Sequence, residues 1–191
     1  MLSHVALPLK KPATYDDLLA LPENVVGEIV DDELHVSPRP ASPHALAEAA
    51  LLVALGGPFG FGRDGGPGGW VVLVEPELHI VGQVMVPDLA AWRRERMPVV
   101  PHAPFFDLAP NWLCEVISPS TGALDRAKKM PHYARAGVGH VWLVDPTPQT
   151  LEIFRLDGEG WRLEATHAGE AVVAAPPFEA VPLELARLWA R

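Results

Sequence analysis

Two apolar segments of this chain each carry a single carboxylate within an otherwise hydrophobic run. The first is Val84 to Trp92, with Asp88 directly after a proline, and the second is Trp112 to Ile117, with Glu115. A charged group in a buried strand is costly unless it is paired or bound to a metal. If the segments form adjacent strands, both acids can share one hard cation through their oxygens. If each strand is instead amphipathic, both acids face water.

A third charged group follows the second acid. Asp125, Lys129 and Tyr133 are spaced four residues apart, so one helix face would carry all three and Lys129 would point back toward the acids. The plainer interpretation is an exposed Asp–Lys pair that contributes roughly a few tenths of a kcal/mol. Together, the two acids and this helix favour a site. Pro131 predicts either a bend or a new helix that begins near Met130.

The rest of the chain alternates between helix and strand signals, with turn residues between them. The expected elements are a helix at 14–21, a hairpin at 25–37 around Asp31-Asp32-Glu33, a helix at 44–55 capped by Ser42-Pro43, strands at 70–74, 77–81, 84–92 and 112–117, a helix from about 118 to 136, a strand at 140–144, a hairpin at 151–165 and a closing helix at 183–190. This order predicts an α/β (α+β) domain with a mixed central sheet flanked by helices. The segment 56–69, rich in Gly and Pro, is expected to be a flexible surface loop.

The charge of the chain limits how it could bind nucleic acid. Its net charge is −9, whereas proteins that hold DNA through phosphate contacts are usually basic. A nucleic-acid substrate would therefore need a bound divalent cation or a second chain. No apolar run reaches the about 18–20 residues of a membrane helix, the first twelve residues do not resemble a signal peptide, and Cys114 is the one cysteine. We expect a cytoplasmic protein with no membrane partner.

Several short motifs together resemble one bacterial family. They are Glu28-Ile29-Val30-Asp31, Pro87-Asp88, Glu115 to Thr121, Asp125 through Lys129 to Tyr133, Ala136-Gly137-Val138 and Val141 to Pro146. The set spans about Tyr15 to Phe154 and is similar to the Uma family of proposed restriction endonucleases, part of the PD-(D/E)XK nuclease superfamily. The specific part is the block from Glu115 to Pro146.

This resemblance implies a restriction-endonuclease-like core with an added N-terminal hairpin and a site at one edge of the sheet. We therefore expect a single domain over 1–191, with its core at about 15–155 and a C-terminal hairpin and short helix at about 151–191. The superfamily usually has its lysine two residues after the second acid, where this chain has Ile117. The resemblance makes Lys129 the substitute. The family also tends to have Asp-Gly where this chain has Asp31-Asp32.

By position in the motifs, the resemblance makes Asp88 and Glu115 the metal-ligand acids and Glu28 the third acid. The expected function is a Mg²⁺- or Mn²⁺-dependent endonuclease that hydrolyses phosphodiester bonds of DNA, with Lys129 orienting a water or offsetting charge. Cutting both strands would favour a homodimer. His44 could face the site from its helix, but we expect it to be a surface residue at a helix start.

Two alternatives stay open. The chain could be a catalytically degenerate binding or assembly module with a nuclease fold, which the acidic charge and the displaced lysine favour. It could also hydrolyse another phosphodiester with the same metal.

Overall fold

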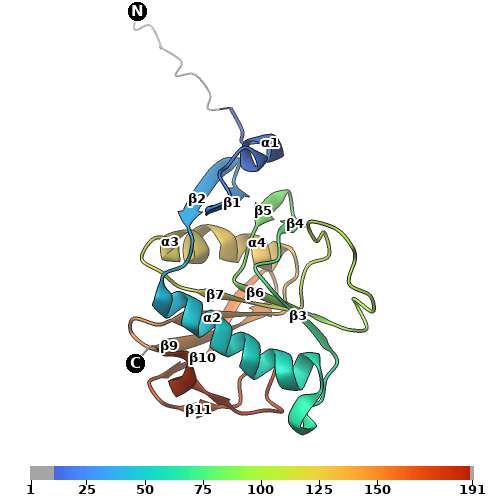
Figure 1. The fold of residues 1–191 in the computed structure, drawn as a ribbon, viewed down its shortest axis with the longest axis vertical. Helices are drawn as coiled ribbons and strands as arrows, with labels where there is room; N and C mark the ends of the chain where they lie inside the picture. Colours follow the sequence, from blue (N-terminus) through green and yellow to red (C-terminus); the bar gives the residue numbers. More distant parts are fainter. Residues whose placement is uncertain (1–10, 190–191) are drawn as a thin grey trace, which may run out of the picture.

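A six-stranded β-sheet of mixed orientation forms the centre of the computed structural model, which describes residues 11–189 (Figure 1). Its strands, in spatial order, are β10 (Gly160–Ala168), β9 (Thr150–Asp157), β8 (His140–Asp145), β7 (Trp112–Val116), β6 (Leu89–Arg93) and β3 (Trp70–Val74). Only the β7–β8 pair within this sheet is parallel. The predicted mixed central sheet is confirmed.

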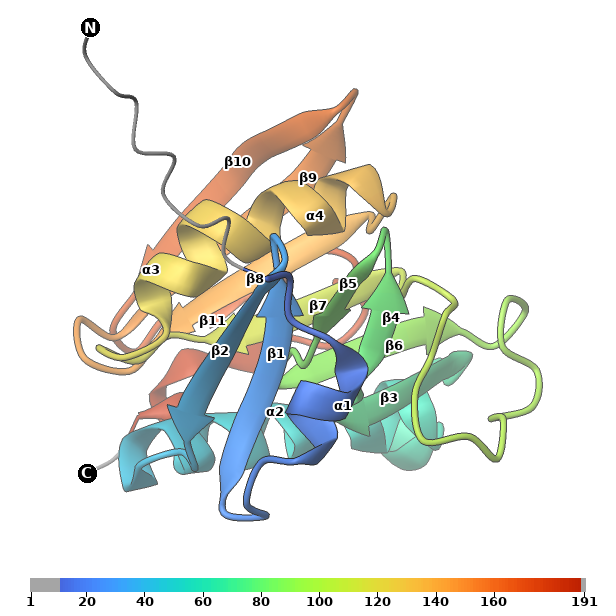
Figure 2. The same cartoon turned by 90° about the horizontal axis from the view of Figure 1, so that it is seen from above.

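A smaller sheet contains the predicted N-terminal hairpin (Figure 2). Its order is β2 (Glu33–Pro38), β1 (Val25–Val30), β5 (Gln83–Met85) and β4 (Leu78–Ile80). Asp31 and Asp32 form the turn with φ of 54° and 62°. Short polar side chains such as Asp tolerate this left-handed conformation, so the turn forms without the glycine that the family tends to have.

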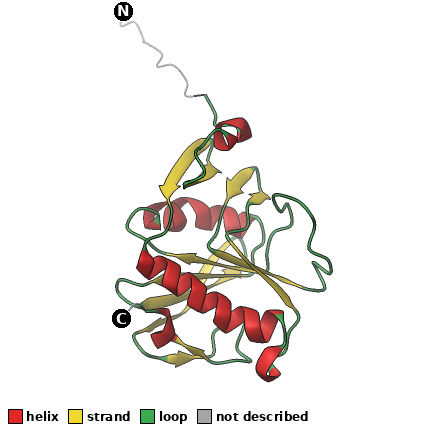
Figure 3. Ribbon diagram, viewed as in Figure 1, coloured by secondary structure: helices red, strands yellow, loops and turns green. Residues whose placement is uncertain are grey.

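Helices cover both faces of the large sheet (Figures 1 and 3). α2 (Ser42–Leu55) packs on one face, and α3 (Gly122–Leu124), the π-helical turn η3 (Asp125–Lys129) and α4 (Met130–Arg135) pack on the other. The alternation of side chains along β7 follows these two faces. Trp112 and Cys114 belong to the core under α2, whereas Leu113 belongs to the core under α4. By the same alternation, Glu115 points to the α4 side.

The short helix α1 (Tyr15–Leu19) begins as its sequence predicts. Thr14 and Asp17 form a reciprocal capping box at its start. The predicted cap of α2 is wrong, because Ala41 occupies the N-cap position and no side chain caps the helix.

The predicted continuous strand at 84–92 is also wrong. Its two halves are β5 in the small sheet and β6 in the large sheet, with Val86, Pro87 and Asp88 between them. Pro87 has no N–H to donate to a strand ladder, so the pairing breaks there. Asp88 consequently lies at the entry to β6, where the chain passes from one sheet to the other.

The helix predicted from 118 to 136 is divided into three parts. Thr121 precedes α3, the wider turn η3 follows, and α4 begins at Met130 with Pro131 in its first turn. A proline is tolerated there because the first N–H groups of a helix have no partner within the helix. The predicted new helix near Met130 is confirmed.

The expected flexible loop at 56–69 is partly ordered by the core. Residues Gly56–Gly60 form a π-helical turn (η1) that continues α2, and Arg63–Gly65 form a 3-10 turn (η2). Phe59 is buried against Phe178, with ring centroids 4.8 Å apart. The prediction failed because Phe178, which orders this segment, is distant in sequence.

The predicted closing helix at 183–190 is wrong over its described part. Leu183–Glu184 is a strand, β12, paired with β11 (Val172–Val173), and Leu185–Leu188 is a 3-10 turn (η4). The remainder of that prediction, and the N-terminal residues 1–10, lie outside the described residues. Among the described helices, none is long and apolar enough to cross a membrane.

Phe178 lies at the centre of the core under α2. Its ring centroid is 4.7 Å from that of Trp70, 5.1 Å from Trp112 and 5.8 Å from Trp142. The C-terminal segment thus completes the hydrophobic core of the large sheet, and we propose that the chain is a single domain.

We expect Phe178→Ala to lower the free energy of unfolding by about 3–5 kcal/mol, because it leaves a cavity among three tryptophans. Leu163→Ala is the control, since that side chain is 49% exposed and its loss should cost less than about 0.5 kcal/mol. Urea denaturation followed by fluorescence and circular dichroism measures both. Similar losses, or a Phe178→Ala transition that leaves most of the sheet folded, would contradict one shared core.

Candidate functional site

A cleft of about 250 Å³ lies where the small sheet approaches the entry to β6 and the end of β7. Its lining includes all four residues singled out from the sequence: Glu28, Asp88, Glu115 and Lys129. Ser118 and Asp125 also line it, together with Arg39 and His44. The structure therefore brings the candidate residues together from four separate parts of the chain.

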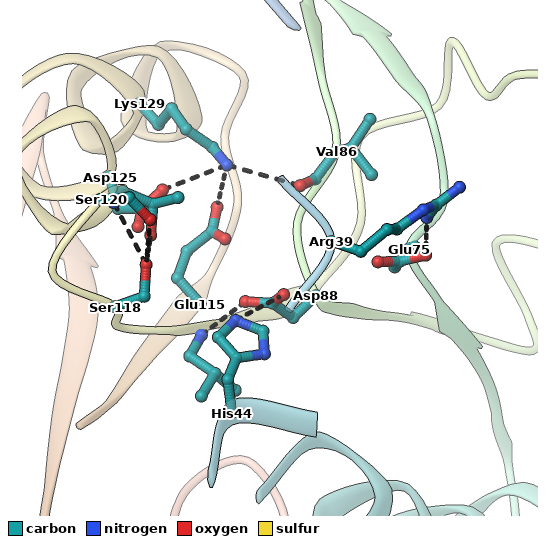
Figure 4. Close-up of polar contacts among 12 residues, drawn as sticks. Arg39, His44, Glu75, Val86, Asp88, Glu115, Ser118, Ser120, Asp125 and Lys129 are labelled. Carbon is teal, nitrogen blue, oxygen red and sulfur yellow. Dashed lines mark hydrogen bonds and ion pairs between the residues drawn. The ribbon is translucent and has the colours of Figure 1, made fainter. Parts of the chain in front are cut away.

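The Lys129 ammonium group occupies the centre of the charged cluster (Figure 4). Its Nζ lies 2.8 Å from Glu28 Oε1, 2.8 Å from Glu115 Oε1 and 3.3 Å from Asp125 Oδ1. The side chain is only 2% exposed. Lys129 thus points toward the acids, as its helical spacing predicts, and the interpretation as an exposed Asp–Lys pair is excluded.

Glu115 lies in the interior on β7, on the face that α4 covers. Its Oε1 accepts a hydrogen bond from the Tyr133 hydroxyl at 2.6 Å in addition to the contact with Lys129. Burial raises the pKa of Glu115 well above its ordinary value, and the neighbouring carboxylates of Asp125 and Asp88 add to this, while Lys129 opposes it.

Lys129 stays protonated in this surrounding. Burial by itself lowers the pKa of a lysine, but Glu115 and Glu28 outweigh that effect and raise the pKa of Lys129 well above its ordinary value. One ammonium group therefore faces three buried carboxylates. A bound cation could join Lys129 in offsetting the charge of these groups in their ionised form.

Glu28 is held in place by its backbone surroundings and by its hairpin. Its Oε1 accepts a hydrogen bond from the Val86 N–H at 2.8 Å. The hairpin tip is joined to the helical layer by Lys128 with Glu33 and by His132 with Asp31, each at 2.9 Å. These contacts fix β1 next to η3.

Asp88 lies next to Glu115 across the sheet. The register pairs Leu89 with Cys114. Asp88, which precedes Leu89, therefore lies opposite Glu115, which follows Cys114. Asp88 Oδ2 accepts a hydrogen bond from the Val116 N–H at 2.6 Å, and its Oδ1 lies 3.1 Å from His44 Nε2 (Figure 4). The two acids predicted on adjacent strands thus lie at the same end of the sheet.

The expectation that His44 is a surface residue is wrong. It is 9% exposed, because α2 packs its first turn against Asp88. Burial lowers the pKa of His44, yet the hydrogen bond and charge of Asp88 outweigh this and raise it. Sequence reasoning also missed Glu48, one turn later on α2; the i,i+4 spacing from His44 was the available signal. Burial, together with Asp88 and Glu75, raises the pKa of Glu48 to about 7.

Arg39 lies at the mouth of the cleft. Among the described lining residues, Arg39 and Lys129 are the two with a permanent positive charge. The Arg39 side chain is 54% exposed and its Nη1 lies 3.2 Å from Glu75 Oε2 (Figure 4). Ser118, on the opposite side, accepts a hydrogen bond at Oγ from the Thr121 N–H at 3.2 Å. This contact closes a local turn directly before α3.

The donor groups of the cleft fit a divalent cation. Asp88 and Glu115 offer hard carboxylate oxygens at the same end of the large sheet. A second group consists of His44, Glu48 and Asp88, which each offer one ligand atom within 4.8 Å of the others. The cleft could therefore hold a metal ion.

A family model and a solved structure match this chain. The model of the Uma2 family, described as "Putative restriction endonuclease", matches residues 12–186. The crystal structure of "a putative nuclease belonging to DUF820" from Anabaena variabilis ATCC 29413 matches with a TM-score of 0.75 and 23% identity, over 93% of this chain and 97% of that chain. At that identity the likeness shows the fold. Comparison with curated proteins gives no match.

We expect Lys129→Met to lower the free energy of unfolding by about 3–5 kcal/mol, because it leaves buried carboxylates without their counter-charge. Lys128→Met is the matched control. That lysine pairs with Glu33 at the surface, where an ion pair contributes about 0–1 kcal/mol. Urea denaturation of both variants measures the difference.

Adding Glu115→Gln to Lys129→Met removes one of the uncompensated charges, so it should recover part of the lost stability. Equal effects of Lys129→Met and Lys128→Met, or no recovery in the double variant, would contradict the charge balance described for the cluster.

Proposed function

The chain belongs to the Uma2 family, and from this premise we propose that it is a divalent-metal-dependent endonuclease that hydrolyses phosphodiester bonds of DNA. The observation that carries the proposal is the buried Lys129 ammonium, which lies within 3.3 Å of Glu28, Glu115 and Asp125 in a cleft that Asp88 also lines. Such a concentration of buried charge is costly for folding, which favours a role in chemistry.

In this proposal, Asp88 and Glu115 hold Mg²⁺ or Mn²⁺, and Glu28 completes the set directly or through water. The bound ion would polarise a phosphate oxygen and lower the pKa of a bound water. The protein positions these carboxylates in advance. The Val116 N–H holds Asp88, and the Val86 N–H holds Glu28.

Lys129 has an electrostatic role rather than a role as a base. Its Nζ lies 2.8 Å from Glu28 and 2.8 Å from Glu115, which favour the protonated form and raise its pKa, so we assign it no part in accepting a proton from an attacking water. An ammonium group donates hydrogen bonds, which suits it to orient that water or to offset charge developing at the phosphate.

Arg39 is the group that we assign to phosphate binding at the mouth of the cleft. Lys129 is buried and committed to carboxylates, whereas the Arg39 guanidinium is exposed and held by one ion pair with Glu75 and one hydrogen bond to the Glu23 carbonyl. A guanidinium can exchange such a pair for two hydrogen bonds to a phosphate.

One observation favours a second candidate, a binding or assembly module without catalysis. The Lys129 ammonium already pairs with both Glu28 and Glu115, which partly balances the buried charge without a metal. Metal binding that depends on Asp88 and Glu115 would separate the two candidates. The buried, free Cys114 supports our further proposal of a cytoplasmic location.

We expect the wild-type protein to nick plasmid DNA with Mg²⁺ or Mn²⁺ and Asp88→Asn to lower the rate by about 100-fold or more. The reason is that several kcal/mol of charge stabilisation depend on a metal ligand. Asp107→Asn, a change at an exposed acid outside the cleft, should leave the rate unchanged.

The outcomes of this assay separate the candidates. If the wild type binds Mn²⁺ through Asp88 but does not cleave DNA, then DNA is the wrong substrate and another phosphodiester takes its place. If the wild type neither cleaves nor binds metal, the endonuclease proposal fails and the binding module replaces it.

We expect Arg39→Ala to weaken DNA binding about 10-fold and to reduce the slope of log K against log salt by about one, because one phosphate contact is lost. Fluorescence anisotropy in an Asp88→Asn background measures binding without cleavage. Arg162→Ala is the control, since Arg162 also pairs with an acid and is 64% exposed, but lies on the distant β10. Equal effects of both changes would contradict a specific role for Arg39.

A further inference from the structure

Three potential metal ligands lie on the α2 side of Asp88, and the proposed mechanism leaves two of them unused. His44 and Glu48 are one turn apart on the same face of α2, and Asp88 approaches them from the entry to β6. One ligand atom from each residue lies within 4.8 Å of the others. Two separate elements therefore direct a nitrogen and two oxygens toward one point.

The spacing of His44 and Asp88 suits two neighbouring ligands of one small ion. Their atoms Nε2 and Oδ1 are 3.1 Å apart. Ligands at about 2.0–2.2 Å from a metal, with angles of about 90–109° between them, stand roughly 2.8–3.6 Å from each other. A metal could thus replace the contact between these two atoms with little movement of either side chain.

The His44 ring is buried next to one of these acids. The residue is nine-tenths buried, and its Nε2 faces Asp88 (Figure 4). Nε2 is therefore the ring nitrogen that a metal bound between His44 and Asp88 would take as its ligand.

The charges around the ring favour a cation. Glu48 and Asp88 are both partly buried, and in their ionised forms their carboxylates repel each other at this separation, which a shared cation would relieve. Lys129, which balances the neighbouring cluster, has its contacts with Glu28, Glu115 and Asp125 rather than with this group.

We propose that His44, Glu48 and Asp88 form a second metal position, which binds a divalent transition metal of the class of Mn²⁺ and Zn²⁺. The imidazole ligand sets the preference, because nitrogen donors suit these ions, whereas Mg²⁺ takes oxygen ligands and keeps its water. The position shares Asp88 with the Mg²⁺ or Mn²⁺ site of the proposed function. It does not require that the chain cleave DNA.

Calorimetric titration of the full-length protein with Mn²⁺ tests the proposal, together with the visible absorption of bound Co²⁺, which reports a nitrogen ligand. His44→Ala and Glu48→Gln should weaken binding at one site by about 10-fold or more and diminish the Co²⁺ absorption. His79→Ala is the matched control. The Nε2 of His79, which lies on β4, also contacts a carboxylate, that of Glu77, at 2.7 Å. His79→Ala should leave both measurements unchanged.

Glu115→Gln separates this proposal from the proposed function. If Glu115→Gln retains the Co²⁺ absorption while His44→Ala and Glu48→Gln lose it, the second position stands whether or not the protein cleaves DNA. If His44→Ala and Glu48→Gln bind Mn²⁺ and Co²⁺ as the wild type does, the second position does not exist. Because Glu48 is only partly buried, Glu48→Gln keeps the test valid if His44→Ala does not fold.

Discussion

One buried ammonium group connects three parts of the chain that are distant in sequence. Lys129 lies on η3 and contacts Glu28 from the small sheet and Glu115 from the large sheet, at 2.8 Å each. Neither carboxylate would stay buried without a counter-charge, and the lysine would not stay buried without the carboxylates. The contact that positions the small sheet over the end of β7 is therefore the same contact that gives the cleft its chemistry.

Local patterns predicted much of the fold, because hairpin turns and helix starts depend on neighbouring residues. The hairpin around Asp31-Asp32 and the helix start at Thr14 follow from short-range chemistry of this kind. The adjacency of Asp88 and Glu115 could also be predicted, since a single acid in an apolar strand needs a partner. The family resemblance gave the order of the motifs and pointed to Lys129, whose helix spacing agrees with it.

Three of the failures have a common cause, which is that contacts between distant parts of the chain decided the outcome. The run at 84–92 is apolar apart from Asp88, and Pro87 marks a weak point in a strand but does not show that the chain crosses there from one sheet to another. Burial of His44 depends on Asp88, and the order of residues 56–60 depends on Phe178, both far away along the chain. No window of neighbouring residues contains that information.

The π-helical turn at Asp125–Lys129 also determines where the length of this chain can vary. A π-turn holds one residue more than an α-turn, so deleting a residue there would let the segment close as an ordinary α-helix. Residues after the turn, Tyr133 included, would then keep nearly their present orientation relative to β7, because the π-turn takes up its extra residue locally. A deletion in the α-helical part, between Met130 and Tyr133, would instead rotate Tyr133 by about 100°. The chain length after the π-turn is thus as constrained as the identity of the charged residues.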